Sequence, residues 1–303
     1  MSKLLSPKED TGCDSLGDMA SPDDEAAGPA YTFRKPEGLL AHYTKAATAF
    51  EHILRTRTLR LGAYADMQDP AENKDIVPGT ATYGDREDAE EGWNAAIDAI
   101  KQMRDSCRLL CLTHDAVSTR GTFGCSWARP RMWEQYGDRH RGACLLFDRD
   151  RLHAVLKYEG QGHGAFYLGD VRYTEAGIAE SATRSIMDDR IFNAEERDEA
   201  IDEYIDTHHR DFFFLKSDDF RSEHEFRAVL LAGDFDDDVH IDYRDALVAV
   251  VVGERFPDWQ IAGAAEICNE AGAMCTCPGA GRGLWVRETR VAIRPSRRSR
   301  PAL

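Results

Sequence analysis

Short apolar runs and longer amphipathic segments divide this chain into strands and helices. We predict strands at residues 39–44, 58–61, 107–113, 142–147, 166–173, 223–231, 239–243, 247–252 and 284–291. Apolar residues three or four positions apart predict helices at residues 46–54, 88–104, 130–136, 192–214 and 259–270, with a further short helix after residue 148. Strands outnumber helices and do not alternate with them regularly. The pattern therefore favours an α+β fold with a curved, mainly antiparallel mixed sheet flanked by helices.

Both ends of the chain differ in composition from the region between them. The first 28 residues hold seven acidic residues and two lysines, and the last ten hold four arginines and no acid. Both ends are rich in Ser, Pro and charge, which predicts disorder. We therefore expect a disordered acidic tail at residues 1–30, a single domain at 31–293 and a disordered basic tail at 294–303. The basic tail suits RNA or an acidic partner, but a solvated tail is the more common case.

Composition also narrows the class of protein. The chain has 303 residues, 42% of them hydrophobic, which is enough for a sizeable core. No apolar run approaches the roughly 18 residues that span a bilayer, and the N-terminus lacks the apolar run of a secretory signal. The eight cysteines, in a chain of this length without an export signal, are expected to be free thiols of a cytoplasmic protein. A formal net charge of −16 argues against a protein that coats duplex nucleic acid.

The strongest local signal for chemistry is the run from Phe220 to Leu230. On a strand, Glu223, Glu225 and Arg227 would share one face, because side chains alternate. Two neighbouring carboxylates raise each other's pKa unless a cation intervenes, and Arg227 can supply that cation. The alternative is a solvated ladder of charges on an exposed face. The apolar run that follows favours a site, because it puts the acids at the start of a buried strand.

Two further segments carry polar aromatic residues where binding groups are common. His42, Tyr43 and Thr44 end a short apolar strand just before a helix. Trp133 and Tyr136 lie three residues apart on one face of a short helix that begins at Pro130. A lone histidine is more often a structural hydrogen-bonding residue, and an aromatic pair is more often core than cofactor platform.

Most familiar cofactor and metal motifs are missing. Cys268, Cys275 and Cys277 lack the spacing of a zinc site, and the acidic run at residues 236–238 lacks the spacing of a calcium loop. The sequence contains no GxGxxG, Walker, HExxH or Gly-x-Ser-x-Gly motif. We therefore expect no metal site.

Taken together, several segments resemble the bacterial domain-of-unknown-function family 2971. The similar pieces, in family order, are His42-Tyr43-Thr44, Leu59-Arg60-Leu61, Asp69-Pro70 with Glu72, Cys111-Leu112-Thr113, Met132-Trp133, Tyr136-Gly137, His140-Arg141-Gly142, Leu145 to Asp148, Lys216, Phe220, Glu223 to Arg227 and Val251-Val252-Gly253. The resemblance covers about residues 38–255. It departs from the family at Phe220, where Trp is usual, at Met67-Gln68, where Phe-Asn is typical, and in an enlarged segment at residues 74–105.

The order of these residues is also similar to that of the ADP-ribosyltransferase superfamily. That resemblance implies an NAD-consuming enzyme, with His42 and Thr44 on the NAD ribose and with Tyr43, Trp133 and Tyr136 lining or supporting the nicotinamide pocket. Glu225 would be catalytic, Glu223 would activate or orient the acceptor, and Arg227 would hold the carboxylates apart. NAD is then the substrate, the acceptor is an unknown protein, nucleic acid or water, and a toxin or anti-phage role follows.

Two other readings stay open. One is a non-catalytic ligand-binding or sensor module in a defence or regulatory system, and the other is a metal-dependent nuclease. The transferase hypothesis requires residues distant in sequence to share a cleft. We therefore expect the strand at 223–231 to be central in the sheet and adjacent to the strand at 39–44.

Overall fold

A computed structural model describes most of the central part of the chain. The described residues are 38–67, 79–80, 89–118, 121–160, 162–175, 186–187, 189–231 and 239–276. All of them belong to the compact unit Arg34–Leu303. The two predicted tails and the predicted strand at 284–291 lie outside the described residues. Within the described part of the chain, no helix has both the length and the apolar character needed to span a bilayer.

The predicted elements are largely present with small shifts at their ends. The strands are β1 (Leu39–Thr44), β2 (Thr58–Ala63), β3 (Gly79–Thr80), β4 (Arg108–His114), β5 (Ala116–Ser118), β6 (Gly121–Gly124), β7 (Ala143–Asp148), β8 (Ala165–Asp170), β9 (Arg172–Thr174), β10 (Ile186–Met187), β11 (Leu215–Ser217), β12 (Glu225–Leu231), β13 (Val239–Asp242), β14 (Leu247–Val252) and β15 (Met274–Thr276). The helices are α1 (Leu54–Thr56), α2 (Ala89–Ser106), α3 (Pro130–Gln135), α4 (Arg149–Gly160), α6 (Arg197–Phe213) and α7 (Ile261–Glu270). Shorter helical turns are η3 (Thr48–Ile53), η4 (Tyr64–Asp66), η5 (Asp189–Phe192), η6 (Asp218–Glu223) and η7 (Asp258–Gln260).

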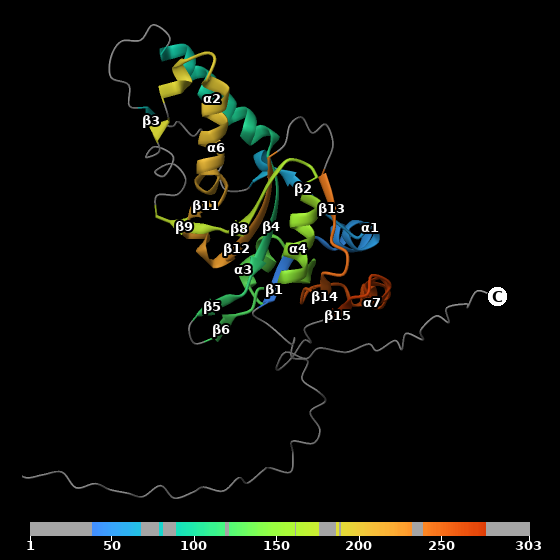
Figure 1. The fold of residues 1–303 in the computed structure, drawn as a ribbon. Helices are drawn as coiled ribbons and strands as arrows, with labels where there is room; N and C mark the ends of the chain where they lie inside the picture. Colours follow the sequence, from blue (N-terminus) through green and yellow to red (C-terminus); the bar gives the residue numbers. More distant parts are fainter. Residues whose placement is uncertain are drawn as a thin grey trace, which may run out of the picture. The chain divides into compact units, whose positions relative to one another are not determined.

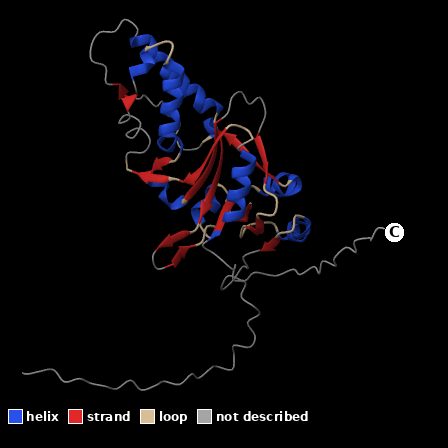
Figure 2. Cartoon of the chain, in the orientation of Figure 1, coloured by secondary structure: helices blue, strands red, loops and turns tan. Residues whose placement is uncertain are grey.

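A nine-stranded, mainly antiparallel sheet organises this unit. Its strand order is β13-β2-β4-β1-β7-β14-β15, and a branch runs from β4 through β12 to β8. β14 and β15 pair in parallel, while the other pairs of this sheet are antiparallel. Figures 1 and 2 show the strands running through the centre of the unit with helices on either side. The α+β fold expected from the sequence is therefore confirmed.

Each face of the sheet packs against its own group of helices. Phe226, Ala228 and Leu230 of β12 point into a core that includes side chains of α4 and α7. Val229 of β12 and Leu109 of β4 point into a second core, with side chains of α2 and α6. α2 and α6 lie side by side in Figure 1. The two-residue alternation read from the sequence for β12 thus separates two cores.

The sheet splits at β4, and this split positions the candidate site. β1 pairs with β4 only at Leu40–His114 and Ala41–Thr113. Further along β4, the same edge pairs with β2 instead, at Gly62–Leu109. Between these two pairings, β4 has no neighbouring strand on that side among the described residues. A space therefore opens between β1 and β2, beside the middle of β4.

The structure corrects four expectations from the sequence. β12 is not adjacent to β1, because β4 lies between them and pairs with both. The single strand predicted at residues 166–173 is two strands, and β9 leaves the sheet to pair with β11. The strand predicted from residue 223 begins at Glu225, because residues up to Glu223 form η6. The long acidic helix begins at Arg197 rather than near residue 192, after the separate turn η5.

Candidate functional site

The site is built around the first residues of β12. Glu225 and Arg227 point to the same face of the sheet, as strand alternation predicts, and both are buried, at 4% and 0% exposure. Arg227 donates to Glu225 through Nε at 2.7 Å and through a terminal nitrogen at 3.1 Å. Its other terminal nitrogen donates to the Phe213 carbonyl at 2.7 Å. This forked geometry fixes the carboxylate more firmly than a single ion pair would.

The backbone of Glu225 is held as firmly as its side chain. Its N–H donates to the Tyr173 hydroxyl at 2.9 Å, and its carbonyl accepts from the Val171 N–H at 2.8 Å. Across the sheet, Glu225 is in register with Thr113 of β4. Neighbouring segments therefore hold Glu225 from both sides. The sequence pattern did not point to Tyr173.

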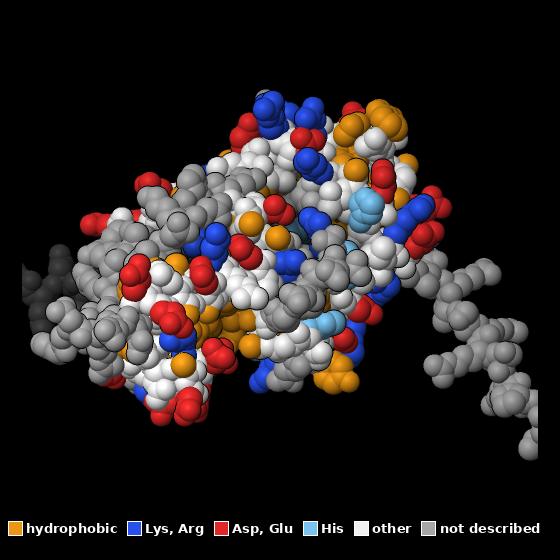
Figure 3. Space-filling view, turned by 90° about the horizontal axis from the view of Figure 1, so that it is seen from above, with side chains coloured by type: hydrophobic (Ala, Val, Ile, Leu, Met, Phe, Trp, Pro, Cys, Tyr) orange, Lys and Arg blue, Asp and Glu red, His pale blue; other side chains and the backbone are white. Residues whose placement is uncertain are grey.

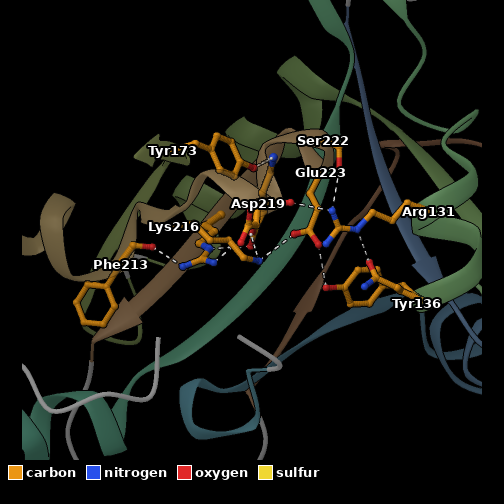
Figure 4. Close-up of polar contacts among 11 residues, drawn as sticks. Arg131, Tyr136, Tyr173, Phe213, Lys216, Asp219, Ser222 and Glu223 are labelled. Atoms are coloured by element: carbon orange, nitrogen blue, oxygen red, sulfur yellow. Dashed lines mark hydrogen bonds and ion pairs between the residues drawn. The ribbon is translucent and has the colours of Figure 1, made fainter. Parts of the chain in front are cut away.

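Lys216 bridges the two glutamates; the sequence pointed to it only as part of the family resemblance and gave it no role in the site. Its Nζ lies 2.9 Å from Oε2 of Glu223 and 3.2 Å from Oε2 of Glu225. The ammonium also lies 4.6 Å from the centre of the Phe220 ring. Figure 4 shows Lys216 beside the Glu223 carboxylate. Arg227 was expected to separate the carboxylates, but it is Lys216 that stands between them. A lysine directly after the buried run Phe212–Leu215 was the available signal.

Glu223 reaches the site from a turn rather than from the strand. It is the last residue of η6 and is 2% exposed. His224 follows with φ of 45°, in the left-handed region, which reverses the chain before β12 starts. Tyr136 donates its hydroxyl to Oε1 of Glu223 at 3.3 Å. This longer contact leaves Glu223 less firmly held than Glu225.

The charges around Glu225 determine its protonation state. Burial alone would raise its pKa, but the charges of Arg227 and Lys216, together with hydrogen bonds, lower it to about 2. Glu225 is therefore ionised throughout the physiological range. Burial raises the pKa of the Tyr136 hydroxyl, and the nearby Glu223 charge raises it further. Tyr136 therefore acts as a hydrogen-bond donor to Glu223.

β1 supplies the opposite wall of the site. His42 is half-buried, and its Nδ1 lies 3.3 Å from the Cys111 carbonyl, where β4 has parted from β1. Burial lowers the pKa of His42, while the hydrogen bond with Cys111 opposes this shift. The imidazole is therefore neutral at pH 7 and can both donate and accept a hydrogen bond. Thr44 ends β1 and is half-buried.

Tyr43 and Trp133 form the support behind that wall. Their rings meet edge to face with centroids 5.1 Å apart. The Tyr43 hydroxyl donates to the Ser126 carbonyl at 2.5 Å, and the Trp133 indole donates to the Trp127 carbonyl at 2.8 Å. Both side chains are buried and satisfied. The pair therefore fixes β1 against α3.

Arg131 of α3 contacts η6, the turn that ends at Glu223. Arg131 donates to the Asp219 carbonyl at 2.8 Å and lies 3.3 Å from the Ser222 hydroxyl. Its guanidinium lies 5.4 Å from the centre of the Phe220 ring. Figure 4 shows Arg131 and Tyr136 approaching the η6 side of the site together. This contact holds Tyr136 in reach of Glu223.

One cavity of about 810 Å³ opens where the sheet splits and collects most of the predicted residues. Its lining includes His42, Tyr43, Thr44, Tyr136, Glu223 and Glu225, and also Lys216. Trp133 and Arg227 are not part of the lining, since they stand behind Tyr43 and Glu225. The exposed charge ladder, considered from the sequence, is wrong because both glutamates are buried.

The described polar groups do not form a metal site. Within the described residues, no three His, Cys, Asp or Glu side chains converge as metal ligands would. Cys268 and Cys275 are free, and Cys277 lies outside the described part of the chain.

Comparison with known proteins adds one match. No curated protein and no solved structure matches the chain significantly. Residues 132–228, about a third of the chain, match the family described as "Protein of unknown function (DUF2971)". This segment contains Tyr136, Lys216, Glu223 and Glu225, but not the β1 wall. The chain is thus similar to the DUF2971 family over the segment that supplies the carboxylate side of the cavity, in support of the resemblance read from the sequence.

Proposed function

We propose that this protein is an ADP-ribosyltransferase-like enzyme that cleaves NAD at its nicotinamide–ribose bond. The observation that carries the proposal is the single cavity shared by His42, Thr44, Tyr136, Glu223 and Glu225. These residues come from β1, α3, η6 and β12, and only the folded chain brings them together. The cavity volume lies within the roughly 300–1,000 Å³ typical of small-ligand sites.

Cleavage of this bond requires a fixed negative charge in a site that excludes water. When the bond between ribose C1′ and the nicotinamide nitrogen breaks, the electron pair leaves with nicotinamide and a cationic sugar remains. An ionised carboxylate already in position stabilises that cation without reorganising solvent. Glu225 meets this requirement, because it is buried, held by Arg227 and ionised with a pKa of about 2.

Glu223 suits the second half of the reaction. An acceptor hydroxyl, amine or water attacks C1′ and gives up a proton, and a carboxylate nearby can take that proton. Among the described residues, Oε1 of Glu223 has only the longer contact with Tyr136, whereas both oxygens of Glu225 are bound by Arg227. We therefore assign the electrostatic role to Glu225 and the proton-accepting role to Glu223.

Charge balance sets a condition on this mechanism. Lys216, Arg227, Glu223 and Glu225 sum to no net charge, so their long-range effect on a sugar cation is small. The carboxylates stabilise the cation only if their oxygens lie nearer to C1′ than the two positive groups do. Arg227 is fully buried behind Glu225, so the Glu225 carboxylate lies nearer to the cavity than the Arg227 guanidinium does. The condition is therefore met for Arg227.

The test is nicotinamide release by the purified full chain and by three variants. Glu225→Gln keeps shape and removes charge, so turnover should fall by on the order of 10² or more while NAD affinity changes only a few fold. Glu223→Gln should reduce transfer to an acceptor more than hydrolysis of NAD. Gly62→Leu serves as a blocking variant, because Gly62 lines the cavity and an added Cβ meets nothing within 4 Å. Equal nicotinamide release by the wild type and Glu225→Gln would contradict the proposal.

A non-catalytic sensor is the second candidate, and the closed ion-pair network favours it. Lys216 already pairs with both carboxylates, and Arg227 pairs with Glu225, as they would in a structural network. Binding of NAD by the wild type without any nicotinamide release would select this reading. For the enzyme, the proposal extends to the expected cytoplasmic location, an unknown protein or nucleic-acid acceptor, and a toxin or anti-phage role.

A further inference from the structure

The wall of the cavity formed by β2 carries a second set of polar groups. Thr58, Arg60 and Gly62 alternate with the fully buried Leu59 and Leu61, so the first three share the outward face of β2. All three line the cavity. This wall therefore combines a guanidinium and a hydroxyl with the space that a glycine leaves.

The neighbouring strand adds an imidazole at the same level. In the antiparallel β13–β2 pair, His240 is directly opposite Arg60. Both side chains are exposed, and both line the cavity. Directly opposed residues have Cβ atoms about 5 Å apart. Both side chains can therefore contact one anion bound between them.

Further basic and hydroxyl groups line the same cavity. Lys45 and His52 are exposed and line the same cavity. The hydroxyls of Thr56 and Thr58 lie 2.7 Å apart beside them. This cluster contrasts with the acidic chain as a whole, whose formal net charge is −16. In Figure 3, Asp and Glu side chains (red) gather at the lower left of this face, and histidines (pale blue) lie towards its right, where further acidic side chains are also visible.

The two ends of the cavity differ in charge and in burial. Glu223 and Glu225 are buried at the inner end, whereas Arg60 and His240 are exposed at the outer end. The exposed part of the lining also includes the carboxylate of Asp66. A phosphate would be repelled by the carboxylates, but Arg, Lys, His and hydroxyl groups are its usual partners. A ligand with both a sugar and phosphates would bind with the phosphates outward.

We propose that Arg60 and His240 form a phosphate subsite that binds the diphosphate of a nucleotide ligand. The sugar attached to that diphosphate then extends inward towards the two glutamates. Naming the whole ligand as NAD rests on the proposed function. The subsite itself rests on the register of β2 with β13 and on the charge contrast along the cavity.

Binding measurements on the full chain test the subsite. The probes are ADP-ribose and inorganic pyrophosphate, which carry phosphates, and nicotinamide riboside, which has none. Arg60→Gln should weaken binding of both phosphate probes by about tenfold to a hundredfold, the usual effect of losing a charged hydrogen-bond pair. Binding of nicotinamide riboside should change less than about twofold. His240→Gln should act in the same direction with a smaller effect.

Arg55→Gln is the matched control, because Arg55 is an exposed arginine on the adjacent α1 and does not line the cavity. It should leave the binding of all three probes unchanged, and equal melting temperatures would show that each variant folds. No binding of the phosphate probes to the wild type, or equal losses in Arg55→Gln and Arg60→Gln, overturns the subsite. Pyrophosphate binding that depends on Arg60, without nicotinamide release, supports the subsite and overturns the transferase proposal. Nicotinamide release with a KM for NAD unchanged in Arg60→Gln overturns the subsite alone.

Discussion

Glu225→Gln should destabilise this protein strongly, and the loss should shrink in acid. The substitution keeps the size of the side chain but removes its charge. Arg227 and Lys216 then remain buried, at 0% and 3% exposure, with one carboxylate fewer to balance them. An exposed charge ladder, by contrast, would gain stability or stay level when one of two neighbouring carboxylates is neutralised.

Two independent arguments give the same magnitude. Breaking a buried ion pair by removing one partner costs about 3–5 kcal/mol. The pKa of Glu225 falls from its ordinary value of 4.5 to about 2 on folding. That difference corresponds to about 3 kcal/mol of stability, since one pKa unit is worth about 1.4 kcal/mol. We therefore expect Glu225→Gln to lose about 3 kcal/mol at pH 7.

The sign of the pH dependence follows from the lowered pKa. The contribution of ionised Glu225 is complete above pH 4.5 and is lost as the pH falls towards 2, the pKa in the folded state. The difference between wild type and variant should fall to roughly half near pH 3. Urea unfolding followed by circular dichroism at pH 7, 4.5 and 3 measures this difference, provided that both proteins unfold reversibly.

An exposed glutamate supplies the control. Glu254→Gln alters an exposed side chain and should change stability by less than about 0.5 kcal/mol at each pH. A Glu225→Gln variant as stable as the wild type at pH 7 would refute the ion-pair reasoning. A stability gap that stays constant from pH 7 to pH 3 would refute the lowered pKa.

Two further predictions concern the frame of the site. Asp148→Ala should lower the free energy of unfolding by about 1 kcal/mol, because the Asp148 carboxylate accepts the Arg151 N–H at 3.0 Å at the start of α4. Thermal melting measures this change, and an unchanged melting temperature would show that the cap is dispensable. Gly142→Ala should cost on the order of 3 kcal/mol, because the new Cβ would lie 2.1 Å from the Thr44 carbonyl oxygen. Gly62→Ala should be nearly neutral, since nothing lies within 4 Å of its Cβ, and equal losses in the two glycine variants would contradict this packing argument.

Local features of the fold could be predicted because their causes lie within a few residues. The alternation in β12 put Phe226 and Ala228 in one core and Glu225 with Arg227 on the other face. Pro130 set the start of α3, and the short helix expected after residue 148 is α4. Side-chain periodicity, caps and proline act over one or two turns, so they can be read without knowing what else touches the segment.

Part of the site was also predictable, because it follows from strand ends. His42 and Thr44 end β1, Glu225 begins β12, and Tyr136 follows α3. Polar residues at such positions stay near solvent while the apolar run beside them is buried. The sequence thus indicated which residues to examine, although it did not show how they face one another.

Tertiary structure decided which of these residues meet, and with which partners. Periodicity sets the face of a strand, but it does not name the neighbouring strand, so β4 between β1 and β12 was not foreseen. Lys216 reaches Glu223 and Glu225 from β11, which pairs with β9 and contacts η6. Arg60 faces His240 through strand pairing across 180 positions of sequence. The ionisation of Glu225 likewise depends on burial and on charges delivered by other elements, since an exposed carboxylate in the same sequence would keep its ordinary pKa.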